Sequence, residues 1–166
     1  MSKSFLCHPL SNTRLILTDN RLTAAARFLD GRGEPASYEF ILDTGAVIST
    51  MSKSTANTFY IYDKDVVNPN ACVGGFNKQP MYGRVIRVSH LHIGIMGVRD
   101  TLFFVPDSDD DIAEVLGSSI LNGLIPIPDF DTNLIWILKN TKVPPPIHSK
   151  NLGVDVACEV LAQEEL

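Results

Sequence analysis

The chain has 166 residues, a hydrophobic fraction of 45%, a charged fraction of 20% and a formal net charge of −5 at pH 7. This length suits a single domain, and the composition is that of an ordinary globular protein, which excludes disordered and fibrous classes. The acidic balance and the scattered Lys and Arg residues argue against a nucleic-acid partner, because phosphate recognition needs concentrated positive charge.

The sequence also argues against a membrane partner. No segment reaches the roughly 18 uncharged apolar residues that a membrane span requires, and the N-terminus lacks the apolar run of a signal peptide. We therefore expect a cytoplasmic protein. Cys7, Cys72 and Cys158 are odd in number and form no CxxC spacing, so we expect neither a disulfide framework nor a zinc site.

The first third of the chain predicts a β-meander. Strand-like apolar runs occupy residues 15–18, 22–29 and 38–42, and turn-forming residues separate them at 19–20 and 30–33. The third run leads directly into an Asp-Thr-Gly tripeptide.

The middle of the chain predicts further β-structure. The polar segment 49–60 allows either a short helix or an irregular connection, because Ser and Thr favour caps and turns over helix interiors. Residues 73–82 predict a hairpin with glycines near its tip. Residues 84–95 and 98–105 predict two strands joined by a tight turn at 96–97.

The last part of the chain predicts a strand at 114–116, a short helix at 118–124 and a final strand at 133–140. Three consecutive prolines then open a linker-like segment, because proline continues neither a helix nor a strand. The expected organisation is an N-terminal lead (1–13), a single domain (14–140) and a Pro-rich linker with a C-terminal tail (141–166).

The carboxylate of Asp43 stands between two apolar segments, 40–42 and 46–48. Burying a lone ionised carboxylate is costly, so such a side chain is normally paired, hydrogen-bonded or used as an acid or base. An isolated Asp-Thr-Gly is most often an ordinary turn, with Asp as a cap and Gly at positive φ. The surrounding sequence therefore has to decide between a turn and a catalytic site.

Three features in one order resemble the retropepsin family, the retroviral-type aspartic proteases. An apolar strand ends in Asp-Thr-Gly-Ala at 43–46, which matches the active-site signature of that family. The sequence VGGFNK at 73–78 resembles the flap that closes over a bound peptide, and VLGSSIL at 115–121 resembles the segment that leads into the family's helix. The resemblance covers roughly residues 14–140.

The resemblance implies both a fold and an activity. The fold is all-β: a retropepsin-like closed β-barrel, equivalent to half of a pepsin-like enzyme, with one short helix. The activity is that of an aspartic endopeptidase, which hydrolyses a peptide or protein substrate without a metal or other cofactor. In such chemistry two adjacent carboxyl groups share one proton, so that one acts as the base toward water and the other as the acid.

The chain carries a single copy of this motif, because the related sequence at 131–133 is Asp-Thr-Asn and lacks the glycine. A dyad therefore requires two chains, each contributing Asp43 across a two-fold axis, and the expected assembly is a homodimer.

The match also implies roles for the neighbours of Asp43. The hydroxyl of Thr44 would hydrogen-bond across the dimer axis, and Gly45 would let the substrate backbone pass close and offer its carbonyl to it. Ala46 replaces the Ser of pepsin-like enzymes and removes a donor that would favour the charged carboxylate. We therefore expect activity at weakly acidic to near-neutral pH.

The flap residues Val73, Gly74, Gly75 and Phe76 are expected to bind substrate, together with Ala46, because their main chain can pair with an extended peptide and exclude water. Candidate walls for apolar pockets, each equally compatible with plain core packing, are Ile48, Val73 and Ile120.

Two departures from the family pattern leave a second function open. Retroviral enzymes often carry acidic residues soon after the Ala, paired with an Arg in the helix, whereas this chain has Val47-Ile48 and Ser118-Ser119 at those places. The charged tie within the subunit is therefore missing. The alternative is a catalytically silent module of the same fold that binds peptides or dimerises.

Two other polar clusters are interpreted as solvated surface. His90 and His92 lie on one face of a predicted strand, but the sequence offers no third metal ligand nearby. The acidic run 107–111 lacks the Gly and the distal Glu of an EF-hand loop.

Overall fold

The structure is a computed structural model that describes residues 9–14, 16–18, 21–74, 80–94, 96–108, 112–121, 124–131 and 134–139. No helix in these ranges is long and apolar enough to cross a bilayer. The elements are β1 (Pro9–Arg14), β2 (Ile16–Thr18), β3 (Arg21–Leu29), β4 (Pro35–Leu42), β5 (Ser49–Thr50), α1 (Lys53–Thr58), β6 (Val66–Gly74), β7 (Pro80–Ile93), β8 (Met96–Pro106), β9 (Val115–Leu116), α2 (Ser118–Leu121), β10 (Leu124–Asp129) and β11 (Leu134–Lys139).

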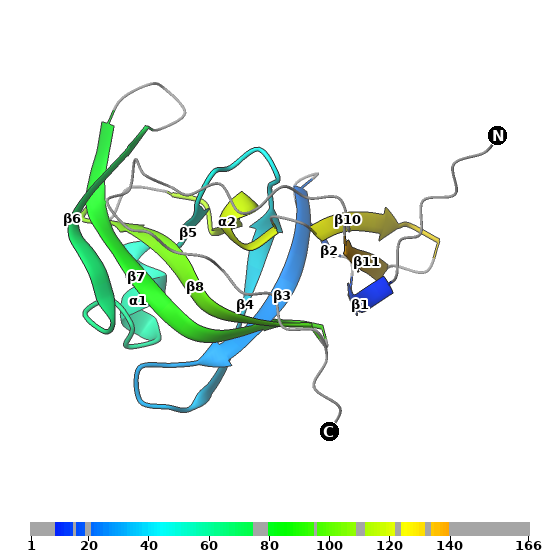
Figure 1. The fold of residues 1–166 in the computed structure, drawn as a ribbon, viewed down its shortest axis with the longest axis horizontal. Coiled ribbons are helices and arrows are strands. Elements are labelled where there is room, and N and C mark those ends of the chain that lie inside the picture. The colour runs from blue at the N-terminus through cyan, green and yellow to red at the C-terminus, as the bar shows by residue number, and fades with distance from the viewer. Residues whose placement is uncertain are drawn as a thin grey trace.

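Six strands form a closed barrel. Their order is β3-β4-β9-β5-β8-β7, and pairing of β3 with β7 closes the ring (Figure 1). Strands β2 and β6 extend the sheet from β3 and β7. Two short parallel pairings, β4 with β9 and β5 with β8, bring distant parts of the chain together. The predicted all-β closed barrel is confirmed.

The barrel is filled by apolar side chains from the inward positions of its strands. Strands β3 and β7 alternate buried and exposed residues, as expected for strands with one face in a core. The largest fully buried side chains of this core are Phe40, Met51, Ile86, Leu91, Ile93, Phe103, Leu116, Ile120 and Ile135.

A second apolar cluster lies on the other face of β7 and β8. It contains the buried residues Ile48, Ala71, Val85, Leu102 and Phe104. Because this part of β8 is buried on both faces, residues 101–106 are all buried, and residues 102–106 form one continuous apolar run instead of an alternating one.

The prediction of one short helix is incomplete. Helix α1 forms in the segment that the sequence left open, and the hydroxyl of Ser52 caps it by accepting a hydrogen bond from the Thr55 amide at 3.1 Å. Helix α2 starts at Ser118 as predicted but ends at Leu121, and Leu124 belongs to β10 instead of the helix.

Proline-containing strands were missed because proline removes a backbone donor. Strand β6 begins at Val66, and its Pro69 falls in a register irregularity between Asn68 and Ala71 at the edge of the sheet. Strand β10 contains Pro126 and Pro128, two residues apart and therefore on the same side. It is an edge strand paired only with β11, so the missing donors can face away from the ladder.

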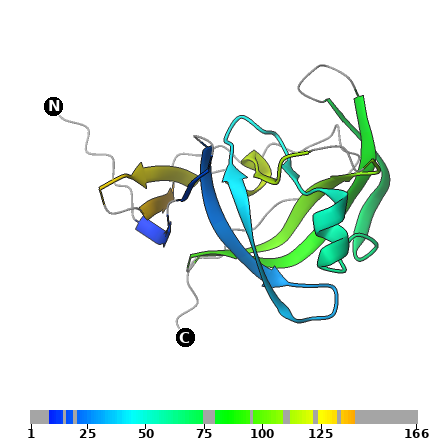
Figure 2. The same cartoon turned by 180° about the vertical axis from the view of Figure 1, so that it is seen from behind.

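A separate three-stranded sheet, in the order β1-β11-β10, stands beside the barrel (Figures 1 and 2). Strand β1 begins at Pro9, so the predicted lead 1–13 contributes to this sheet, whereas residues 1–8 lie outside the described residues. The predicted linker and tail, 141–166, also lie outside them. The prediction of a strand at 133–140 is confirmed as β11.

The turn between β7 and β8 lies earlier than predicted. Gly94 has a φ of 62°, in the left-handed region that favours glycine, and β8 already begins at Met96. Gly97, expected in the turn, instead pairs with His92 within the ladder.

Strands β6 and β7 extend beyond the barrel as a two-stranded arm, defined here as Cys72–Gly74 and Pro80–Tyr82. The last pairing between β7 and β8 joins Gly83 to Pro106. Beyond it the two strands pair only with each other, through Cys72↔Tyr82, Val73↔Met81 and Gly74↔Pro80. The arm rises above the barrel in Figure 1. The predicted hairpin is confirmed, although its tip, 75–79, lies outside the described residues.

Candidate active site

Asp43 lies at the end of β4, where the chain leaves the barrel wall. Leu42 pairs with Leu116 in the parallel ladder of β4 and β9, and the Asp43 amide donates to the Leu116 carbonyl at 3.1 Å. The Asp43 side chain is partly exposed, whereas Thr44 and Gly45 are exposed. The apolar run before Asp43 is therefore the end of a barrel strand, whereas residues 46–48 belong to the loop before β5, and the carboxylate stands at the surface turn between them.

The turn itself holds the carboxylate. The Gly45 amide donates to Asp43 Oδ1 at 2.8 Å, and the Ala46 amide donates to the Asp43 carbonyl at 3.2 Å. A Cβ at position 45 would lie 3.1 Å from the same Oδ1, so glycine allows this close approach. One carboxylate oxygen is thus oriented by the backbone two residues later, in an Asx-type turn.

The loop after Asp43 is fixed to the start of α2 by Ser118. The Ser118 amide donates to the Ala46 carbonyl at 2.7 Å. Its hydroxyl lies 2.9 Å from the Ala46 carbonyl and 3.1 Å from the Val47 carbonyl, so the two acceptors share its proton. Three contacts to one residue keep this loop against the helix.

Two further serines, Ser49 and Ser119, connect the end of the loop to the start of α2. The Ser49 hydroxyl is fully buried, accepts from the Gly117 amide at 3.0 Å and lies 3.1 Å from the hydroxyl of Ser119. Ser119 Oγ in turn accepts from the Ser49 amide at 3.0 Å. Every polar group in this small network has a partner, as buried polar groups require.

Gly117 explains how the two segments come so close. A Cβ at this position would lie 2.7 Å from the Ile48 carbonyl oxygen and 2.8 Å from that of Ala46. These distances are too short for any side chain, so the Val-Leu-Gly sequence serves the approach of loop and helix. The charged tie of the retroviral enzymes is replaced here by uncharged hydrogen bonds from Ser49, Ser118 and Ser119.

The second apolar cluster joins the Asp43 loop to the base of the arm. Ile48 comes from the loop, and Val73 and Met81 form a cross-strand pair on the arm, with Ile112 also packed against the cluster. Val73 is half-buried and Gly74 is exposed. Gly75 and Phe76, also predicted to bind substrate, lie outside the described residues.

Of the three candidate pocket walls, Ile120 lies in a different apolar cluster from Ile48 and Val73. Ile120 is 1% exposed and belongs to the barrel core, so its role is packing. Met81 and Ile112 join Ile48 and Val73 in the second cluster, although the sequence did not single them out. The cross-strand position of Met81, opposite Val73 in the hairpin, was the signal that could have identified it.

The remaining polar candidates do not gather into a metal centre. Among the residues that the structure describes, no group of three His, Cys, Asp or Glu side chains could hold a metal ion. His90 and His92 are exposed on β7, opposite Arg99 and Gly97.

Comparisons with known proteins identify the fold. Neither models of protein families nor curated proteins match the chain. Among solved structures, it is similar to the crystal structure of a retropepsin-like aspartic protease from Rickettsia conorii, with a TM-score of 0.52 and 16% sequence identity. The match covers 77% of this chain and 89% of that chain. The chain therefore has a retropepsin-like fold.

Proposed function

We propose that this chain is an aspartic endopeptidase that acts as a homodimer, with Asp43 of each subunit forming the catalytic dyad. The observation that carries the proposal is the turn at Asp43, in which the Gly45 amide orients a carboxylate at the surface of a retropepsin-like fold. The surface position of the Asp43 carboxylate, its orientation by the Gly45 amide and the retropepsin-like fold together favour a catalytic role over that of an ordinary turn.

The need for a second subunit follows from the chemistry. Asp43 makes no hydrogen bond to another carboxylate within the described part of the chain, and the sequence contains one Asp-Thr-Gly. Thr44, Gly45 and the 72%-exposed side chain of Val47 form an open surface around Asp43. We propose that the partner subunit meets this surface and that Thr44 contributes a hydrogen bond across the axis.

In the proposed reaction the two carboxyl groups hold one proton between them. The ionised group removes a proton from water, whose oxygen then attacks the scissile carbonyl carbon while the protonated group donates its proton to the carbonyl oxygen. The resulting tetrahedral diol collapses when the C–N bond breaks: the leaving nitrogen takes a proton from one carboxyl group, and a diol hydroxyl gives its proton to the other as the C=O bond re-forms. Both products leave, and the dyad again holds one proton.

The substrate is proposed to be an extended peptide that lies between the Asp43 loop and the arm. An added strand would pair with the main chain of Gly45 and of the arm at Val73 and Gly74, with Gly75 and Phe76 continuing these contacts. The apolar cluster of Ile48, Val73, Met81 and Ile112 supports a preference for apolar side chains near the cleaved bond.

Incubation of the full-length protein with a peptide library tests this proposal. Wild type should release defined products that a statine-type transition-state mimic suppresses, and Asp43→Asn should release none. Asn can still accept the Gly45 hydrogen bond, so the variant removes the acid-base group and keeps the turn. Asp131→Asn, a change at an exposed aspartate that is also followed by Thr in the sequence, is the matched control and should remain active.

The alternative is a module of the same fold that binds peptides without cleaving them. The exposed Val47, at a place where retroviral enzymes often carry an acid, favours this alternative because it offers an apolar binding surface. If wild type and Asp43→Asn bind the same peptides with equal affinity and neither releases products, the endopeptidase proposal is wrong and the module is supported.

A further inference from the structure

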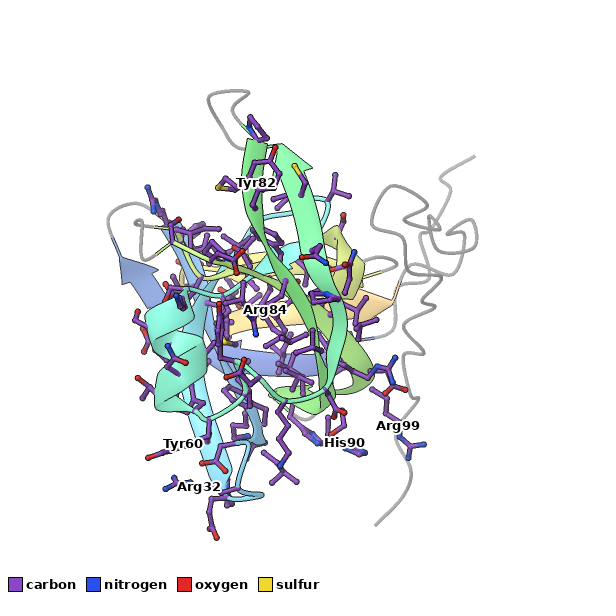
Figure 3. The ribbon with its side chains drawn as sticks, turned by 90° about the vertical axis from the view of Figure 1, so that its left-hand side faces the viewer. Arg32, Tyr60, Tyr82, Arg84, His90 and Arg99 are labelled. Atoms are coloured by element: carbon purple, nitrogen blue, oxygen red, sulfur yellow. The ribbon has the colours of Figure 1, made fainter. Side chains whose placement is uncertain are left out.

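A cluster of charged and aromatic side chains lies at the base of the arm. Its members come from four separate segments and have in common that they contact Tyr62 or its immediate partners. They are Lys53 of α1, Tyr62 and Asp63 of the following loop, Arg84 of β7, and Asp107 just after β8. Figure 3 shows Arg84 on β7 below Tyr82, where the arm begins.

Arg84 is the centre of this cluster. Its Cζ lies 3.9 Å from the centroid of the Tyr62 ring, and its Nη1 lies 2.5 Å from Asp63 Oδ1. Its Nη2 lies 4.0 Å from Asp107 Oδ1. Nε is buried and has no hydrogen-bond partner among the described residues. The guanidinium is therefore held by its flat face and its two outer nitrogens, a geometry that a lysine cannot reproduce.

Tyr62 connects Arg84 to the end of β8. Its hydroxyl donates to Asp107 Oδ1 at 3.3 Å, and Lys53 donates to the Asp107 carbonyl at 2.9 Å. Burial raises the pKa of Tyr62, so the phenol keeps its proton through neutral pH and remains a donor. The Asp107 amide donates to the Tyr82 carbonyl at 3.0 Å. This bond joins the cluster to Tyr82, the arm residue next to the barrel.

The backbone at the same point leaves no room for a side chain on residue 83. A Cβ on Gly83 would lie 2.2 Å from the Val105 carbonyl oxygen and 2.7 Å from Pro106 Cα. Gly83 is also the last residue of β7 that pairs with β8. The ladder that holds the arm to the barrel thus ends at Gly83, and Arg84 is the first anchored side chain on the barrel side.

We propose that the Tyr62–Arg84–Asp107 cluster is the fixed hinge of the arm and that Arg84 is a positioning residue, which limits how far the arm opens above Asp43. The exposed ion pair to Asp63 contributes little, because water screens it, whereas the stacked guanidinium on the Tyr62 ring is the contact that resists opening. The catalytic consequence rests on the proposed function, but the hinge itself does not.

Hydrogen exchange tests the hinge, because it does not depend on turnover. The variants are made in the full-length Asp43→Asn protein. In Arg84→Lys and in Tyr62→Leu, the amides of the cross-strand pair Val73 and Met81 should exchange about tenfold faster, while those of Phe103 and Phe104 stay unchanged. Arg99→Lys, an exposed change at the opposite end of β8 in Figure 3, is the control and should have no effect.

Unchanged arm exchange in both variants would overturn the hinge, and so would equal acceleration in the arm and the barrel, which would indicate a general loss of stability. In the enzyme with Asp43 intact, Arg84→Lys should raise KM more than it lowers kcat, because a loosened arm binds substrate less well. A wild type without any peptidase activity would contradict the proposed function and leave the exchange result as the test of the hinge.

Discussion

At the scale of single residues, the site depends on two glycines at which a side chain would crowd a neighbour, at position 45, or clash with the backbone, at position 117. Gly45 lets its amide reach the Asp43 carboxylate, and Gly117 lets two carbonyls of the loop approach the helix. Both glycines act through close contact, since neither has a positive φ. The carboxylate is therefore positioned by backbone groups, which have no side-chain freedom to lose.

Ala46 is the residue at which the sequence departs most simply from pepsin-like enzymes. In Ala46→Ser a hydroxyl donor beside the proposed dyad should favour its charged form, so we expect the acid side of the pH–activity profile to move down by up to about one pH unit. Kinetic profiles of wild type and variant between acidic and neutral pH give the comparison. An unchanged profile would contradict this role for position 46.

The buried serine pair gives a prediction for stability. In Ser119→Ala the buried Ser49 amide loses its acceptor, and we expect the free energy of unfolding to fall by about 1–3 kcal/mol. Urea denaturation measures this loss. Ser37→Ala, an exposed change on β4, is the control and should stay within about 0.5 kcal/mol of wild type. Equal losses in both variants would show that the Ser49–Ser119 hydrogen bonds do not contribute to the free energy of unfolding.

At the scale of elements, the β3–β4 hairpin is attached to the end of α1 by its turn. The Gly31 amide donates to the Phe59 carbonyl at 2.8 Å, and the Arg32 guanidinium stacks on Tyr60 at 4.2 Å. Within the turn, Asp30 accepts hydrogen bonds from the amides of Arg32 and Glu34 and from the Arg32 side chain. The turn thus connects the meander to a helix that the sequence left undecided.

The same turn predicts a pH dependence. Burial alone would raise the pKa of Asp30, but hydrogen bonds from Glu34 and Arg32 hold it below the usual 3.8. Because the folded-state pKa is lowered, Asp30 stabilises the protein above pH 3.8 and loses this effect as the pH falls through its folded value. Asp30→Asn should therefore lower Tm by a few degrees at pH 7, and the difference from wild type should shrink below pH 3.8.

Thermal melts at several pH values, with Asp63→Asn as an exposed control, make the measurement. A difference that grows toward acid pH would contradict the assigned direction.

At the scale of the whole molecule, the proposed dyad requires two copies. Mixing equal amounts of wild type and Asp43→Asn and allowing subunit exchange should leave about a quarter of the dimers with two carboxylates. Activity per wild-type chain should then fall to about half of its value without the variant. Unchanged activity per wild-type chain after complete exchange would indicate that each chain acts alone.

The sequence was sufficient for the local parts of this architecture. Alternating apolar positions predicted β3, β4 and β7, because a strand with one face in a core carries that period wherever it lies, and a continuous apolar run predicted β8. It failed at β6 and β10, whose prolines are tolerated only because the tertiary structure places these strands at sheet edges. It also could not choose between helix and loop at α1, where propensity was weak.

For the candidate site, the sequence by itself identified the Asp-Thr-Gly-Ala turn and the Gly of the Val-Leu-Gly segment, and its single Asp-Thr-Gly led to the proposal of a second carboxylate from another chain. Only the tertiary structure decided that Ser49, Ser118 and Ser119 hold the loop, that Met81 and Ile112 join the apolar cluster, and that Arg84 lies at the base of the arm. Those contacts join residues far apart in the chain. No periodicity or spacing encodes them, since they depend on which strands become neighbours when the barrel closes.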